Sequence, residues 1–214
     1  MNEENKNLKL ARIAREENNQ DDAKKYYGEV VNEDPDNGEA RFFNLYYALQ
    51  TGTNGEIPDR LVNIVKALET SVKLVSLSQD TVDEKLDIIE EITKTYTPLV
   101  WSLYKYIDDF EKRNPSREEY VIAPSKVALL INSGVVGLYN LGDYIRKYFP
   151  GNAKADNLAL IPWKEAIRLH QKWRMYPKFH FNNIAPEDYA AKVKLIDNSY
   201  EMPRKSGCIG SISK

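Results

Sequence analysis

One stretch of this chain repeats apolar residues at a spacing that requires a long helix. From residue 80 to residue 110 they recur at alternating steps of four and three, which places them on one helical face. They are Val82, Leu86, Ile89, Tyr96, Val100, Leu103, Ile107 and Phe110, with Thr93 in the single gap. We therefore expect an amphipathic helix over 80–110, capped by Ser78 or Asp80. Pro98 should bend or break it near Thr97, because proline removes one backbone hydrogen bond.

Similar patterns predict helices along most of the remaining chain. We expect two short helices within 6–33, a third over 39–49, and longer ones over 58–75, 124–149, 158–176 and 186–200. No segment alternates convincingly with period two, so we expect no β-strand. The predicted fold class is all-α, with a helical hairpin followed by an antiparallel helical bundle. Within the bundle, Gly134 and Gly137 should permit a close helix crossing.

Turn-forming residues and composition divide the chain into three predicted segments. The stretch 51–55 is rich in Gly, Thr and Asn and forms the clearest linker. We expect the hairpin and third helix over 1–55, the helical body over 56–201, and a flexible tail over 202–214. The tail is small, polar and basic, which is typical of a terminus that no packing holds.

Composition excludes several classes of protein. The net charge of -2 and the lack of a long basic tract indicate no basic surface that would attract nucleic acid. The longest uncharged stretch, 127–142, is shorter than the about 20 apolar residues of a membrane span. The first residues carry charges throughout and lack a signal-peptide core. One cysteine excludes an intramolecular disulfide. We therefore expect a cytoplasmic protein with no membrane span and no nucleic-acid partner.

Motifs for catalysis, metals and cofactors are missing from the sequence. The two histidines, His170 and His180, are separated by Pro177 and cannot share one helical face as a metal pair would. The glycine-rich segment 207–214 lacks the order of a phosphate-binding loop. Cys208 is either an inert tail residue or a reactive thiol. We expect a non-enzymatic protein with no metal and no cofactor.

The N-terminal segment carries the residue spacing of a paired-helix repeat. Its matching positions are Leu10, Ala11, Ala23, Tyr27, Val30 and Pro35. On these residues, the segment 5–50 resembles one tetratricopeptide repeat followed by the first helix of a second. Ala14 replaces the usual aromatic, and the pattern ends beyond Thr51. Because one repeat cannot bury its own apolar face, we expect it to pack on the downstream helices.

A looser likeness covers the whole chain. The segments 139–147 and 163–170 resemble those of uncharacterised bacterial proteins that join such a repeat to a helical body. Some of those proteins carry a zinc ribbon, whose cysteines this sequence lacks. The resemblance implies no biochemical activity.

The repeat resemblance implies a function in protein binding. In such repeats the first helix of each pair lines a groove for a peptide, which would here contain Leu8, Arg12, Arg15, Phe42, Tyr46 and Leu49. Aromatic residues with arginine are typical of interfaces, so an extended peptide or an acidic C-terminal tail would suit this surface. The carboxylate-clamp pattern is not met, because Leu8, Arg12 and Phe43 occupy its places. The alternative is that Phe42, Tyr46 and Leu49 are simply core.

Two further hypotheses stay open from the sequence. The chain could be a helical small-molecule binder or an unrecognised enzyme, in which case polar groups should converge on a pocket near Tyr139, Trp163 or His170. It could also self-associate as a homo-oligomer through the apolar face over 82–110. The leading hypothesis is a protein-interaction or scaffold module.

Overall fold

The computed structural model describes residues 5–53, 56–112, 124–173 and 181–203. Within these ranges the chain forms α-helices and one short 3-10 turn, and no β-strand, which confirms the predicted all-α class. Residues 204–214 of the tail predicted over 202–214, with Cys208, lie outside the described residues, and so does His180.

The helices follow the predicted order closely. They are α1 (Lys6–Glu16), α2 (Gln20–Glu33), α3 (Gly38–Gln50), α4 (Ile57–Leu77), α5 (Val82–Lys112), α6 (Pro124–Tyr148), α7 (Ala153–Trp173) and α8 (Pro186–Ile196), with the 3-10 turn η2 (Phe181–Asn183) before α8. Asparagine side chains cap the first three helices at Asn5, Asn19 and Asn37, each accepting a hydrogen bond from a backbone N–H of the first turn. Proline begins α6, as predicted.

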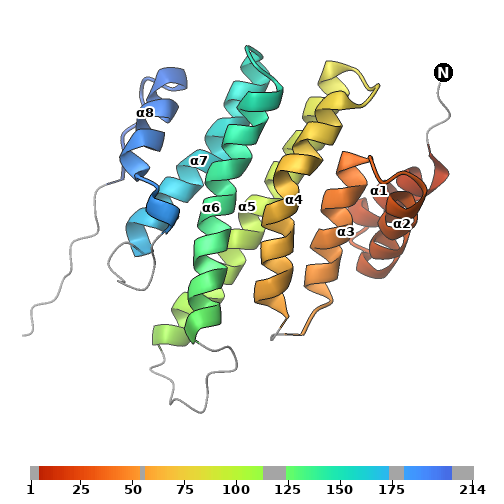
Figure 1. The fold of residues 1–214 in the computed structure, drawn as a ribbon, viewed down its shortest axis with the longest axis horizontal. Coiled ribbons are helices and arrows are strands. Elements are labelled where there is room, and N and C mark those ends of the chain that lie inside the picture. The colour runs from red at the N-terminus through yellow and green to blue at the C-terminus, as the bar shows by residue number, and fades with distance from the viewer. Residues whose placement is uncertain (1–4, 54–55, 113–123, 174–180, 204–214) are drawn as a thin grey trace, which may run out of the picture.

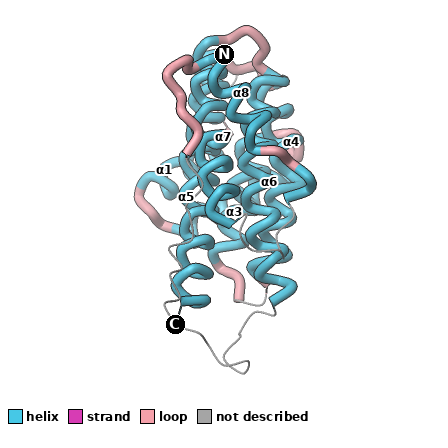
Figure 2. Tube along the Cα trace, turned by 90° about the vertical axis from the view of Figure 1, so that its left-hand side faces the viewer, coloured by secondary structure: helices cyan, strands magenta, loops and turns pink. Residues whose placement is uncertain are grey.

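The helices stack side by side in one elongated row. Figure 1 shows the α1–α2 hairpin at one end, followed by α3, α4, α6, α7 and α8, with α5 behind α4 and α6. Contacts along the chain agree, because α3 packs on α4, α4 on α6, α6 on α7, and α7 on α8. Figure 2 shows the same stack from the side, with the described loops at the ends of the helices. Buried side chains form one continuous core from Leu8 to Val193, so the hairpin packs on the downstream helices as expected.

Of the bend or break expected near Pro98, the break does not occur. The α5 helix continues through Pro98 without interruption. Tyr96, Leu99 and Val100 are all buried against neighbouring helices. Their packing outweighs the single backbone hydrogen bond that proline removes. The predicted cap is also wrong, because Thr81 rather than Ser78 or Asp80 accepts a hydrogen bond from an α5 backbone N–H, that of Glu84.

Most of the apolar face of α5 is buried against other helices of the same chain. Leu86, Ile89, Tyr96 and Val100 are at most 5% exposed, whereas Val82 at the helix start is 53% exposed. Self-association through this face would therefore require the helix to leave the core.

Glycines bring α5 and α6 together, as predicted. A Cβ atom at Gly134 would lie 3.0 Å from a methyl group of Val100, and one at Gly137 would overlap the Tyr96 ring and hydroxyl. The Tyr96 hydroxyl donates to the carbonyl oxygen of Gly134 at 3.3 Å. The close crossing of α5 and α6 therefore depends on having no side chain at Gly134 and Gly137.

Candidate functional site

A groove of about 770 Å³ separates the N-terminal hairpin from the start of α5. Its walls come from α1, the α2–α3 turn, the first residues of α3, the end of α4 and the start of α5. The lining residues are Asn5, Leu8, Arg12, Asp34, Asp36, Asn37, Gly38, Glu39, Leu74, Val75, Leu77, Ser78, Gln79, Asp80, Glu84 and Ile88. The groove thus collects residues that are far apart in the sequence.

Acidic side chains outnumber basic ones in this groove. Five carboxylates line it, from Asp34, Asp36, Glu39, Asp80 and Glu84, against one guanidinium, from Arg12. Except for Glu39, which is 3% exposed, these carboxylates belong to exposed residues. The groove therefore has a negative electrostatic potential.

Local turn chemistry fixes two of the exposed carboxylates. The Glu84 carboxylate accepts hydrogen bonds from the backbone N–H and the hydroxyl of Thr81, at 2.8 and 2.7 Å. Thr81 and Glu84 thereby form a capping box at the start of α5. The Thr81 hydroxyl and N–H lower the pKa of Glu84, which keeps its carboxylate charged at neutral pH. The Asp80 carboxylate accepts from the Ser78 hydroxyl at 2.8 Å.

Apolar side chains form the other part of the groove wall. Leu8 and Val75 are buried, and Leu74 and Ile88 are half-buried. Leu77, the last residue of α4, is 67% exposed. Leu77 therefore offers apolar surface at the rim, beside the carboxylate of Asp80.

Two of the six predicted peptide-binding residues line the groove, and the others lie elsewhere. Leu8 and Arg12 are lining residues. Phe42 and Leu49 are 1% and 4% exposed and belong to the core, as the alternative interpretation expected. Tyr46 is half-buried and stacks on Phe42 with ring centroids 6.4 Å apart. Arg15 lies over the ring of Phe43 at 4.4 Å.

Both predicted arginines bind a buried carboxylate. Glu39 accepts hydrogen bonds from the Arg12 guanidinium at 2.6 Å and from that of Arg15 at 3.3 Å. The Tyr27 hydroxyl also donates to Glu39, at 3.0 Å. Burial and the neighbouring Glu39 charge raise the pKa of Tyr27, so its hydroxyl stays protonated as a donor. Arg15 also approaches Glu91 on α5, at 3.8 Å. These contacts tie α1, α2, α3 and α5 together behind the groove.

The residues expected near a small-molecule pocket meet in the core. The Tyr139 hydroxyl lies 3.1 Å from Nδ1 of His170, and Nε1 of Trp163 donates to the Tyr139 carbonyl oxygen at 3.1 Å. All three residues are buried. Tyr189 lies next to Tyr139, with ring centroids 4.2 Å apart, and donates to Asp143 at 2.6 Å. The Tyr139 hydroxyl and the Trp163 Nε1 thus both have hydrogen-bond partners inside the core.

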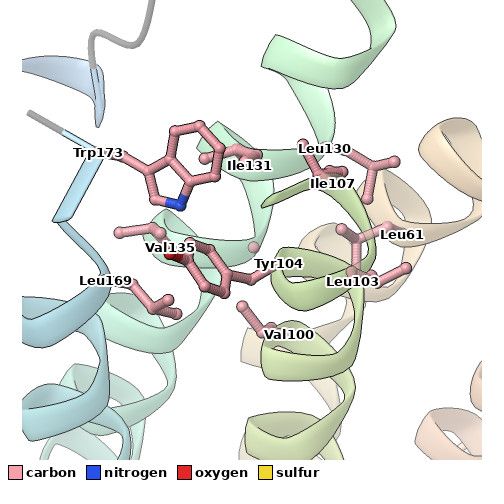
Figure 3. A pocket seen from close by; sticks show the side chains of 11 residues that line it. Leu61, Val100, Leu103, Tyr104, Ile107, Leu130, Ile131, Val135, Leu169 and Trp173 are labelled. Atoms are coloured by element: carbon pink, nitrogen blue, oxygen red, sulfur yellow. The ribbon is translucent and has the colours of Figure 1, made fainter. Parts of the chain in front are cut away.

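A second cavity lies between α4, α5, α6 and α7. Figure 3 shows its wall, which is formed almost entirely by apolar side chains and includes Tyr104 and Trp173, whose rings meet edge to face at 5.3 Å. Its volume of about 10 Å³ is room for roughly one water molecule. Such a cavity is a packing gap rather than a substrate site, because ligand pockets are far larger.

The described part of the chain contains neither a candidate metal site nor a candidate membrane span. No group of three or more His, Cys, Asp or Glu residues there is arranged to hold a metal ion. None of the described helices is both long and apolar enough to cross a membrane.

Comparisons with known proteins do not assign the chain to a family. No family model matches the chain, and neither a curated protein nor a solved structure does. The likeness to a tetratricopeptide repeat therefore stays a prediction.

Sequence reasoning missed most of the groove. Asp36, Asp80, Glu84 and Leu77 were not among the predicted site residues. The Thr81-to-Glu84 spacing is a readable capping box, and Asp34 and Asp36 flank a proline turn. Neither signal indicates that the two turns face one groove.

Proposed function

We propose that this chain is a non-enzymatic protein-interaction module that binds a peptide or protein segment in the groove beside its N-terminal hairpin. The groove itself, with its volume of about 770 Å³, is the observation that carries the proposal. Helices α1 and α3 both contribute to it, which fits the groove-lining role that the repeat resemblance implies for them.

The character of the groove wall supports a segment of protein over a small metabolite. Metabolite sites are enclosed and mostly apolar, with a few polar groups. Here exposed Asp34, Asp36, Asp80 and Glu84 line an open surface beside the exposed Leu77. A charged rim beside an exposed apolar side chain is typical of a protein-binding surface.

The proposal includes a cytoplasmic location. A chain with a single cysteine forms no internal disulfide and needs no oxidising compartment to fold.

A capture experiment with matched leucine variants tests this function. The full chain and its Leu77→Gln variant are used as baits in lysate of the source cell, and bound proteins are identified by mass spectrometry. Leu195→Gln is the control, because Leu195 is 84% exposed near the end of α8, away from the groove. We expect a protein that binds the full chain and the control but is lost with Leu77→Gln. Equal capture by all three baits would contradict binding in the groove.

A further inference from the structure

Arg12, which lines the groove, and its neighbour Arg15 already form ion pairs within the chain. The Arg12 guanidinium forms an ion pair with Glu39 at 2.6 Å, and the same carboxylate binds Arg15. Arginines held by a buried carboxylate are not available for an acidic tail. The acidic C-terminal ligand expected from the sequence therefore has no free cation of Arg12 or Arg15 to bind.

The exposed carboxylates of the groove, by contrast, accept hydrogen bonds from uncharged groups. Asp80 and Glu84 accept hydrogen bonds from Ser78 and Thr81, which are uncharged groups of their own turn. Asp34 accepts from the backbone N–H of Asp36 at 3.2 Å. These hydrogen bonds orient the carboxylates without cancelling their charge. At Glu84 the charge of Arg12 also helps to lower the pKa of the carboxylate. Lysine or arginine side chains of a binding partner would complement these charges.

Apolar surface lies within the same groove. Leu77 is 67% exposed, and Leu74 and Ile88 remain partly open beside it. Burying such a side chain under a partner stabilises the complex, since each square ångström of apolar surface removed from water contributes favourably. A ligand that also carries an apolar residue would therefore cover this part of the wall.

We propose that the occupant of the groove is a basic protein segment, in which lysine or arginine side chains meet Asp36, Asp80 and Glu84 and an apolar side chain covers Leu77. This inference rests on the proposed function and specifies its ligand. Charge complementarity of this kind steers association and weakens as salt screens it. We accordingly expect added salt to weaken the affinity through its electrostatic contribution, whereas the contact with Leu77 is not screened in this way.

Selection from a phage-displayed library of random peptides tests the ligand class. The full chain is immobilised, and enriched peptides are sequenced and compared with the unselected library. We expect enrichment of peptides that combine Lys or Arg with Leu, Ile, Phe or Trp. Enriched peptides without a basic bias would overturn this inference and leave the groove proposal standing. Failure to enrich any peptide would count against the proposed function itself.

Charge variants then place the selected peptides in the groove. Asp36→Asn/Asp80→Asn removes two groove carboxylates, and we expect it to weaken binding of an enriched peptide at least about threefold. The control Asp21→Asn/Asp188→Asn removes two exposed carboxylates of the first turns of α2 and α8, and should leave affinity unchanged. Equal weakening by both variants would mean that only net charge matters and would overturn the inference. Circular dichroism of each variant checks that the fold is retained.

Discussion

The Arg12 guanidinium lies 2.6 Å from the carboxylate of Glu39, a side chain buried where α1 and α2 meet the start of α3. Arg15 and Tyr27 donate to the same carboxylate. A buried charge is tolerated when several donors surround it. This contact therefore both holds the hairpin together and engages Arg12, the arginine that lines the groove.

Replacing the buried carboxylate should weaken the fold. For Glu39→Gln we expect a loss of ~2–3 kcal/mol in the free energy of unfolding, because two guanidinium groups lose their counter-charge. Both arginines are partly exposed and regain some hydration, which limits the loss. Urea denaturation measures it. Glu16→Gln on the exposed face of α1 is the control, and a Glu39→Gln variant as stable as this control would contradict the assigned role.

Gly38 should be intolerant of any side chain. A Cβ atom there would overlap the Ser71 carbonyl oxygen and lie 2.7 Å from the Val75 nitrogen, both backbone atoms of α4 that cannot move independently. We expect Gly38→Ala to cost about 2 kcal/mol, because α3 and α4 must separate. In Gly28→Ala the new Cβ would meet Asn44 at an ordinary 3.6 Å, so this change within α2 should stabilise by about 0.5–1 kcal/mol. Thermal denaturation of both variants compares them, and a destabilised Gly28→Ala or a neutral Gly38→Ala would contradict the packing.

The buried Tyr139–His170 contact should contribute to stability. Tyr139→Phe removes the hydroxyl that lies 3.1 Å from Nδ1 of His170, and we expect a loss of about 1–2 kcal/mol. Tyr106 is 48% exposed, so Tyr106→Phe should change stability by less than about 0.5 kcal/mol. Chemical denaturation distinguishes the two. Equal stability of both variants would show that the Tyr139 hydroxyl contributes nothing.

Glu56 should make stability fall in acid. Hydrogen bonds from the Thr53 backbone and hydroxyl, with help from Arg60, lower the pKa of Glu56 from 4.5 to about 2. A carboxyl whose folded pKa is lowered stabilises the fold above its unfolded pKa, and that stability is lost as the pH falls toward 2. Glu56→Gln should therefore have a Tm that falls less steeply below pH 4.5 than that of the unchanged chain. Tm measured across this range, with exposed Glu17→Gln as control, checks the prediction, and parallel curves for all three chains would contradict it.

Most of the fold was predictable because each helix buries one regular apolar face. The pattern over 58–75 anticipated α4 within two residues at its C-terminal end, and the spacing over 80–110 anticipated α5. A bend or break was expected at Pro98, and the break was wrong, since local propensity does not show how firmly Leu99 and Val100 are held by neighbours. Tertiary packing keeps α5 continuous through Pro98.

The site was predictable only in part. The repeat-like spacing led to Leu8 and Arg12, which line the groove. The carboxylates of Asp36 and Asp80 come from two different turns, and nothing in the sequence shows that these turns face each other. The carboxylate that both arginines share, that of Glu39, was also hidden, because it is distant in sequence from Arg12 and Arg15.

Photo-crosslinking in the source cell tests the central claim most directly. A photoreactive phenylalanine analogue is placed at Leu77, on the groove, or at Leu195, which is exposed on α8. We expect light to join a partner protein to the chain labelled at position 77 and not to the chain labelled at 195. Mass spectrometry of the adduct should identify a segment with basic and apolar residues. No adduct at 77, or the same adducts at both positions, would contradict binding of a protein segment in this groove.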